Sequence, residues 1–370
     1  MSDRWLSPDL VFDGQDLLNN TALRVVDGVV QSLVSTQDAP PSAEEISGIL
    51  SPGFVDLQVN GGGGVLFNTT PTSDGIRKIA AAHRQFGTTG ILPTVITDTK
   101  EVLTQAVDAV LEAQGSEGIL GIHIEGPHIS MAHRGTHAEQ HVRPMDNATI
   151  GHVARLREAS VAVLITLAPE AATSDQIARL SALGAVVSIG HSDATAEETK
   201  AAMQAGVSCA THLFNAMSPM QSRAPGVTGA VINSEIAAGI IVDGIHVADD
   251  MVGLALRARP KKDLMFLVSD AMPTVGGPDH FNLYGMNVTL VDGRLVNAEG
   301  NLAGAHVTMA EGVARLANEV GLDRAESLRA AITVPARLIE QGARAEIVGT
   351  QSRNLICLDR DLRFTGFLDE

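Results

Sequence analysis

The chain has 370 residues, of which 45% are hydrophobic and 19% are charged, and its formal net charge at pH 7 is −17. This length suits a barrel of about 250 residues with a smaller accessory unit, and the apolar content excludes a mainly disordered protein. The negative charge excludes an extended nucleic-acid surface, which needs clustered Lys and Arg, and no apolar stretch approaches the roughly 20 residues of a membrane span.

The first fifty residues predict short β-strands joined by turns, without helices between them. The clearest runs are 10–14 (LVFDG) and 22–34 (ALRVVDGVVQSLV). Runs of the same kind return after about residue 342, in AEIVGTQSRNLICLDRDLRFTG. We therefore assign residues 1–50 and 342–370 to one small β-sandwich domain assembled from both ends of the chain.

Between residues 51 and 341, short β-rich runs alternate with amphipathic helical stretches, the pattern of parallel strands joined by helical crossovers. In a closed parallel barrel the strands are buried on both faces, and their C-terminal ends open onto the loops that carry chemistry. Eight runs with polar ends fit this description: 54–60, 90–97, 118–125, 161–170, 185–192, 207–215, 238–246 and 264–270. The sequence therefore predicts an α/β protein with a (β/α)8 TIM barrel over residues 51–341.

The stretches between the runs show helical apolar spacing and helix-end signals. Residues 73–87 (SDGIRKIAAAHRQFG) predict a helix that ends near Gly87, and a second predicted helix ends at Gly206. The segment 281–304 (FNLYGMNVTLVDGRLVNAEGNLAG) departs from the alternation. It predicts a strand-rich insertion with a hairpin turn at Asp292-Gly293.

The two cysteines, Cys209 and Cys357, lie in apolar strand-like runs. Buried thiols in a reducing compartment explain them better than a disulfide does. The N-terminus has no basic segment followed by an apolar one, so we expect no secretory signal. Together these features predict a cytoplasmic protein.

Three potential metal ligands, Glu125, His191 and His212, end three different predicted strands. A barrel would bring them together, and two His with one carboxylate form a plausible zinc set that leaves a coordination position open for water. Taken singly, each has a plainer explanation, because a strand-end His is often only hydrogen-bonded and a Glu before Gly-Pro can stabilise a loop. Their shared position at the strand ends favours the metal site.

Asp270 ends the eighth predicted strand, in LVSDAMP. A carboxylate there could act as a general base and then as a general acid, or it could simply cap the next turn, as Pro273 allows. His123 lies two residues before Glu125 and so shares its strand face one layer deeper. We expect it to be a hydrogen-bonded residue of the barrel interior rather than a ligand.

A set of motifs runs in order along nearly the whole chain: SPGFVDLQVNGGGG, GIHIEGPHIS, APE, GHSDAT, THLFNAM, APGVTGA, IIVDGIHV and LVSDAMP. Together they resemble the N-acetylglucosamine-6-phosphate deacetylase family of the amidohydrolase superfamily. The combination of THLFNAM with HIEGPH is far more specific than any single motif. The resemblance implies a barrel with a terminal β-sandwich, a homodimer, and metal-dependent hydrolysis of N-acetyl-D-glucosamine 6-phosphate to D-glucosamine 6-phosphate and acetate in amino-sugar catabolism.

The resemblance also implies residue roles. It makes Glu125, His191 and His212 the ligands of the catalytic metal, Asp270 the acid/base, and His137 of the RGTHAEQ loop a contact of the acetamide or sugar that polarises the carbonyl. It assigns the phosphate to four residues, of which Ala216 acts through its backbone N–H and Arg223 comes from the neighbouring subunit: Asn215, Ala216, Arg223 and His246. One Arg, one His and backbone amides would give a local anion site within an acidic protein, although composition alone predicts that Arg223 is an exposed loop charge.

One departure from the wider superfamily concerns the metal count. Most members carry a His-x-His pair at the end of strand one, where this chain has Gln58-x-Asn60, and neutral amides are poorer zinc ligands than imidazole. The fourth strand also lacks the Lys that binuclear relatives carboxylate. We therefore expect one divalent metal ion, with Zn²⁺ the first candidate, and Gln58 and Asn60 lining the vacated second site near the substrate.

Three alternatives remain at this stage. The substrate could be the galactosamine epimer, N-acetylgalactosamine 6-phosphate, since the loop contacts that select the epimer cannot be identified from sequence. The chain could be another amide hydrolase of the superfamily, such as a dihydroorotase-like protein, but the missing His-x-His and Lys weigh against it. A non-catalytic assembly protein would typically have lost metal ligands, which this chain retains.

Overall fold

The computed structural model describes residues 3–297, 300 and 302–369. Its centre is an eight-stranded parallel sheet in the order β15-β14-β13-β12-β11-β10-β9-β6. The strands are β6 (Phe54–Val59), β9 (Thr88–Ile96), β10 (Gly121–Glu125), β11 (Ala162–Leu167), β12 (Val186–Ile189), β13 (Val207–Ala210), β14 (Ala237–Ile240) and β15 (Met265–Leu267). A parallel bridge between Val59 and Ala271 joins the first strand to the segment after the last. The sheet therefore closes into the predicted (β/α)8 barrel.

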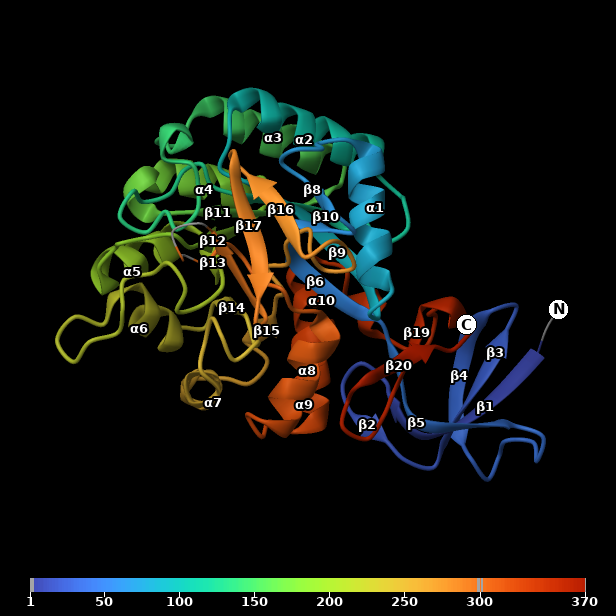
Figure 1. Ribbon diagram of the computed structural model, residues 1–370. Helices are drawn as coiled ribbons and strands as arrows, with labels where there is room; N and C mark the ends of the chain where they lie inside the picture. Colours follow the sequence, from blue (N-terminus) through green and yellow to red (C-terminus); the bar gives the residue numbers. More distant parts are fainter. Residues whose placement is uncertain (1–2, 298–299, 301, 370) are drawn as a thin grey trace.

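The crossover helices surround the strands on the outside of the barrel (Figure 1). They are α1 (Ser73–Arg84), α2 (Lys100–Glu112), α3 (Asn147–Glu158), α4 (Ser174–Ala182), α5 (Ala196–Ala205), α6 (Gly226–Ile232), α7 (Asp249–Ala258) and α8 (Met309–Asn318). Short helical turns lie at η1 (Glu139–His141), η2 (Pro169–Ala171), η4 (Gly342–Ala345) and η5 (Ser352–Asn354). After α8, the chain forms α9 (Arg324–Leu328), the π-helical turn η3 (Arg329–Thr333) and α10 (Val334–Leu338), and the last two pack against β6 and β15.

Side-chain caps explain where several helices begin. Three Thr residues form capping boxes with a Gln or Glu three positions later: Thr173 with Gln176, Thr195 with Glu198, and Thr308 with Glu311. At the other end, Gly206 caps α5 with φ +127°, as predicted, and Gly87 follows the end of α1 with φ +85°. Local sequence and tertiary structure therefore agree along the barrel.

Strands from both ends of the chain form a second, seven-stranded sheet, seen at the lower right of Figure 1 beside both termini. It contains β1 (Asp3–Phe12), β2 (Leu17–Leu18), β3 (Thr21–Val26), β4 (Val29–Ser35), β5 (Glu44–Pro52), β19 (Leu355–Leu358) and β20 (Phe364–Phe367). C-terminal β19 pairs antiparallel with N-terminal β5. The main apolar core includes Phe12 and Ile356 from this sheet, so the boundaries near residues 50 and 342 stay a prediction.

Two smaller sheets lie outside the barrel strands. β7 (Gly61–Gly62) pairs with β8 (Val65–Leu66), and β16 (His280–Leu283), β17 (Met286–Val291) and β18 (Arg294–Asn297) form the predicted insertion. Asp292 and Gly293 make the predicted β17–β18 turn with φ of 51° and 77°. Residues 298, 299 and 301 of this segment lie outside the described part of the chain. Cys209 is a buried free thiol and Cys357 a half-buried one, and no helix of the described residues has the length and apolarity to cross a bilayer.

The junction between β6 and the segment after β15, where the barrel closes, contains a buried carboxyl group. Asp56 on β6 is fully buried, and its Oδ1 accepts hydrogen bonds from the backbone N–H groups of Gln58 and Ser269, each at 3.2 Å. Burial raises the pKa of Asp56 from 3.8 to about 7; the hydrogen bonds from Ser269 and Gln58 offset part of this effect, and the charge of Asp270 adds to it. Asp56 is thus neutral in the folded protein under mildly acidic conditions.

Replacing Asp56 by Asn should remove a pH dependence of stability. The unfolded chain releases the Asp56 proton near pH 3.8 and the folded chain near pH 7, so between these values the folded state binds the extra proton and the free energy of unfolding falls as pH rises. Chemical denaturation of both proteins from pH 5 to pH 8 should show the wild type losing stability relative to Asp56→Asn. Parallel profiles would contradict this assignment.

Candidate active site

Four predicted site residues lie at the mouth of the barrel, where the strands end. Glu125 is the last residue of β10, and His191, His212 and Asp270 follow β12, β13 and β15 by two or three residues. Glu125, His191 and His212 are all at most 5% exposed. Residues separated by up to 145 positions in sequence therefore meet because parallel strands all end on this face.

The backbone is strained at three of these positions. His191, His212 and Asp270 have φ of 49°, 30° and 51°, a left-handed region that non-glycine residues rarely adopt. Such conformations cost on the order of 1–3 kcal/mol each and persist where the surrounding structure enforces them, often at functional sites. All three residues lie just beyond the ends of β12, β13 and β15.

The three potential ligand atoms form a compact triangle. Glu125 Oε1 lies 3.1 Å from His191 Nε2 and 3.0 Å from His212 Nε2, and the two Nε2 atoms are 3.1 Å apart. These edges approach the roughly 3.3 Å that separates ligands in a tetrahedral zinc site with bonds of about 2.0–2.1 Å. Within the described residues, this is the group of three or more His, Cys, Asp or Glu that could hold a metal ion.

The lone pairs of the triangle fit a cation. His191 Nδ1 hydrogen-bonds the backbone oxygen of His133 at 2.9 Å, which fixes its proton there and leaves a lone pair on Nε2. Burial alone would raise the pKa of Glu125, but its close contacts with the His191 and His212 side chains hold it well below 4.5. A carboxylate and an imidazole lone pair thus converge on one point, and the donor set suits a divalent metal ion.

Outer contacts hold the loop that carries His191. Glu170, after β11, accepts hydrogen bonds from Ser192 Oγ at 2.8 Å and from the backbone N–H of Asp193 at 2.7 Å. Asp193 in turn lies 3.0 Å from His133 Nε2, and His133 supplies the carbonyl that orients His191. The loops after β10, β11 and β12 are therefore tied together around one imidazole.

Gln58 of β6 and Asn60, which directly follows this strand, bind the two carboxylates. Gln58 Nε2 lies 3.1 Å from both Glu125 Oε1 and Asp270 Oδ1, and Asn60 Nδ2 donates to Asp270 Oδ1 at 2.7 Å. Burial and the charge of Glu125 raise the pKa of Asp270 to about 6, although His212 and Asn60 lower it in part. The two amides occupy Oδ1, so Asp270 Oδ2 is the oxygen that stays available for chemistry.

His137 reaches the site from the loop between β10 and α3. Its Nδ1 lies 2.6 Å from Thr97 Oγ1 at the end of β9, and its ring lies 4.3 Å from that of His191. Burial and the nearby His191 lower the pKa of His137 well below 6.5, so this imidazole is neutral. Its Nε2 is left to face the cavity.

A polar layer supports the site from below. His123 Nε2 lies 2.7 Å from Thr166 Oγ1, which lies 2.6 Å from Thr211 Oγ1, and Ser188 Oγ joins the same hydroxyl at 2.6 Å. His123 is 1% exposed, and burial lowers its pKa to about 4. It is the expected interior hydrogen-bonding residue.

The predicted phosphate residues are only partly brought together. His246 Nδ1 hydrogen-bonds Asp243 Oδ2 at 2.6 Å, which leaves its Nε2 available, and the buried Nδ2 of Asn215 has no partner among the described residues. His246, Asn215 and Ala216 all line the cavity. Arg223 is exposed on the loop before α6 and does not line it.

The cavity at the barrel mouth has a volume of about 170 Å³. Its polar lining consists of the triangle, Asp270, His137, Asn60 and the three phosphate candidates. Its apolar lining comes from four side chains: Ile96, Ile241, Met272 and Leu302. Gln58 does not line it and instead lies behind the two carboxylates that it binds. A larger hollow of about 650 Å³, lined by residues 134–140 and the β16–β18 insertion, adjoins it at His137 and Leu302.

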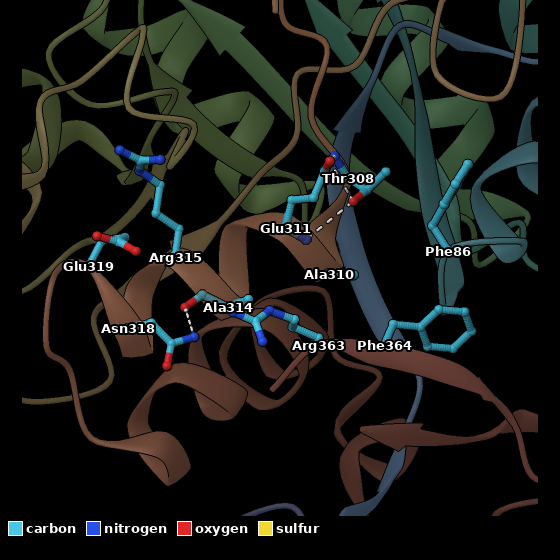
Figure 2. Close-up of a pocket in the computed structure, with 10 residues that line it drawn as sticks. All are labelled: Phe86, Thr308, Ala310, Glu311, Ala314, Arg315, Asn318, Glu319, Arg363 and Phe364. Atoms are coloured by element: carbon cyan, nitrogen blue, oxygen red, sulfur yellow. Dashed lines mark hydrogen bonds between the residues drawn. The ribbon is translucent and has the colours of Figure 1, made fainter. Parts of the chain in front are cut away.

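A separate hollow of about 460 Å³ lies along the outer side of α8 (Figure 2). Arg315 and Asn318 approach it from the helix, and Phe86 and Phe364 bound its other side. The Arg315 guanidinium is already paired, because it binds both oxygens of Asp249 at 2.7 Å. This hollow shares no lining residue with the cavity at the barrel mouth.

Sequence reasoning missed the residues that orient the site rather than form it. Thr97 and Glu170 were visible as polar strand ends, but their hydrogen-bond partners come from other loops. Tyr284 lines the hollow beside His137 although its segment was expected only to be a strand-rich insertion. The one available signal was that Tyr284 is the only tyrosine in the chain and precedes a glycine.

Comparison with known proteins adds to this geometry. Residues 49–342 match the Amidohydrolase family. A protein of Shewanella sp. (strain ANA-3) named N-acetylgalactosamine-6-phosphate deacetylase is 42% identical over 94% of this chain and 90% of its own length.

Two solved structures resemble the whole chain. The crystal structure of N-acetylglucosamine-6-phosphate deacetylase from Pasteurella multocida superposes with a TM-score of 0.91 at 34% identity, covering 99% of this chain and 98% of that one. A variant of N-acetyl-D-glucosamine-6-phosphate deacetylase from Mycobacterium smegmatis, in complex with N-acetyl-D-glucosamine-6-phosphate, has a TM-score of 0.89 at 31% identity, covering 99% and 97%. Sequence match, closed barrel and strand-end site agree, and this chain belongs to the amidohydrolase family.

Proposed function

We propose that this chain hydrolyses the acetamide of an N-acetylated hexosamine 6-phosphate, releasing acetate and the free amino sugar phosphate. N-acetyl-D-glucosamine 6-phosphate is the first candidate. The observation that carries the proposal is the triangle of Glu125, His191 and His212, with Asp270 beside it at the floor of an open cavity. Family membership and the names of the similar enzymes support the same reaction.

Glu125, His191 and His212 would hold one divalent metal ion, most simply Zn²⁺, which when bound polarises a carbonyl oxygen and activates water. Gln58 and Asn60 argue for a single ion, because their amide nitrogens point at carboxylate oxygens as donors. Those two side chains occupy the position where the wider superfamily has ligands for a second ion.

Asp270 is the proposed proton carrier. Hydrogen bonds from Gln58 and Asn60 hold its Oδ1, so Oδ2 takes the proton from the attacking water. The same atom then returns the proton to the amine nitrogen as the carbon–nitrogen bond breaks. A pKa near 6 suits a group that must both accept and donate a proton near neutral pH.

His137 is the proposed donor to the developing oxyanion. Its Nδ1 is occupied by the Thr97 hydroxyl, and its lowered pKa keeps the ring neutral. When Thr97 Oγ1 donates to Nδ1, the imidazole proton lies on Nε2 and points toward the reaction centre. Donors fixed in advance at the site of developing charge are a large source of rate acceleration.

Anion binding at the far side of the cavity would use His246 Nε2, Asn215 Nδ2 and the backbone N–H of Ala216. These groups supply at most one full positive charge for a phosphate in a protein of net charge −17. Arg223, exposed and without an ion pair among the described residues, would supply the second positive charge from a partner subunit of a homodimer.

The free thiols fit the further expectation of a cytoplasmic enzyme.

N-acetylgalactosamine 6-phosphate is the second candidate substrate. The 42% identity to a protein named for that activity favours it, since the similar glucosamine-type structures are 31–34% identical. The two sugars differ only at one hydroxyl, so the acetamide chemistry is the same for both. A higher kcat/KM for the galacto epimer would assign this chain to the second substrate.

Acetate release from both sugar phosphates tests the function directly. Wild-type protein loaded with Zn²⁺ should release acetate, a chelator should abolish the release, and Asp270→Asn should lower kcat on the order of 10²–10⁴-fold because it removes the proton carrier. Asp279→Asn, which changes an exposed carboxylate nine positions later, is the matched control and should leave kcat unchanged. No acetate from either epimer would refute the proposed reaction, and near-normal kcat in Asp270→Asn would remove Asp270 from it.

A complementation experiment tests the partner arginine. Arg223→Ala and Asp270→Asn should each be nearly inactive alone, but co-expressed in equal amounts they should recover about a quarter of wild-type activity per site. Random pairing makes half of the dimers mixed, and each mixed dimer has one site with both an intact Asp270 and the partner's arginine. Absence of recovery despite mixed dimers would show that Arg223 does not act across an interface.

A further inference from the structure

The tip of the β16–β17 hairpin carries an unusual residue for its turn. Leu283 pairs with Met286, so the two residues between them, Tyr284 and Gly285, form the turn with φ of 50° and 84°. Turns with two positive φ values favour Asn-Gly or Asp-Gly, because a large side chain is strained there. A tyrosine at this position conflicts with local preference, and such conflicts concentrate at functional positions.

The side chain of Tyr284 extends to the residue that follows β9, where its hydroxyl makes a hydrogen bond. It donates a hydrogen bond to the backbone oxygen of Thr97, and the backbone of Ala138 lies close enough to the phenol oxygen to lower its pKa in part. Thr97 holds His137 Nδ1 through its side chain at 2.6 Å, and Ala138 is the next residue after His137. The Tyr284 hydroxyl is therefore hydrogen-bonded to the backbone of the same residue whose side chain holds the His137 ring.

The hairpin is itself fixed to the barrel mouth. Phe281, Leu283 and Val288 are at most 8% exposed, and they pack in one apolar cluster with Ile96 and Met272. Ile96 is the residue before Thr97, and Ile96 and Met272 both line the cavity. The tyrosine thus reaches Thr97 from a rigid base and not from a free loop.

We propose that Tyr284 is a positioning residue for His137, acting through Thr97. By fixing the Thr97 backbone, Tyr284 holds the Thr97 hydroxyl against Nδ1 and so keeps the imidazole proton on Nε2, aimed at the cavity. The catalytic use of that proton rests on the proposed function, but the position of the ring does not. Burial, with the charge of Asp98 next, raises the pKa of the Tyr284 phenol, so this group stays a hydrogen-bond donor at working pH.

Kinetics of Tyr284→Phe on Zn²⁺-loaded protein test the proposal. Loss of the hydroxyl should lower kcat on the order of tenfold and change KM less than about twofold, because a displaced group costs rate in the transition state rather than binding. Asn287→Ala, which removes a hydrogen bond to Thr289 within the same hairpin, is the matched control and should keep wild-type kcat. Thr97→Val should reproduce Tyr284→Phe, while Thr97→Ser, which retains the hydroxyl, should not.

A double-mutant cycle separates positioning from simple support of the hairpin. In a His137→Ala background, Tyr284→Phe should change kcat less than about twofold, since the residue it positions is gone. An equal loss of kcat in both backgrounds would overturn the proposal and leave Tyr284 as a structural residue. Wild-type kcat in Tyr284→Phe would overturn it as well.

Imidazole NMR gives a readout that needs no turnover. In protein labelled with ¹⁵N-histidine, the His137 signals are identified by their loss in His137→Ala, and they should report a proton on Nε2 in the wild type and a mixture of tautomers in Tyr284→Phe. Unchanged His137 signals would overturn the proposal. If the wild type released no acetate from either sugar phosphate, the proposed function would fail while this measurement still decided whether Tyr284 positions His137.

Discussion

The site depends on one electrostatic convergence, in which Glu125 Oε1 and the Nε2 atoms of His191 and His212 lie 3.0–3.1 Å from one another in a buried position. A buried carboxylate beside an imidazole lone pair is unfavourable unless a cation or a proton lies between them. The folded state carries this electrostatic cost and also the conformational cost of left-handed backbone at His191, His212 and Asp270. Those strained turns are what direct side chains from separate strands toward one point.

The contacts that close the barrel also position Asp270, the proposed proton carrier. Asn60 N–H donates to Ala271 O at 2.9 Å, and this bond brings Asn60, together with Gln58 of the first strand, against Asp270 after the last strand. Two amides therefore hold one oxygen of Asp270 and leave the other toward the cavity. Thr97 is hydrogen-bonded to both His137 and Tyr284, and in our proposal these contacts hold the His137 ring in place. The two groups with proposed roles in proton transfer and oxyanion binding are thus each held by contacts from distant parts of the chain.

Much of this architecture could be predicted from sequence, because polar ends on apolar runs are a local signal. Glu125, His191, His212 and Asp270 each lie at or near the C-terminal end of such a run, and the geometry of parallel strands then brings them together. The contacts of Thr97, Glu170 and Tyr284 could not be predicted, because each joins a side chain to a loop whose path is set by tertiary packing. Arg223 is a different case, because its proposed role comes from resemblance and not from a local signal. Within one chain it lies exposed outside the cavity. Domain boundaries were equally hard to set, because one apolar core runs from the terminal sheet into the barrel.

Anomalous diffraction at the zinc edge, from crystals of the full chain loaded with Zn²⁺, tests the central claim most directly. The account predicts a single strong peak per chain, within about 2.0–2.3 Å of Glu125, His191 Nε2 and His212 Nε2, and no second peak beside Gln58 and Asn60. An ion bound elsewhere, or none at the triangle after loading, would contradict the account.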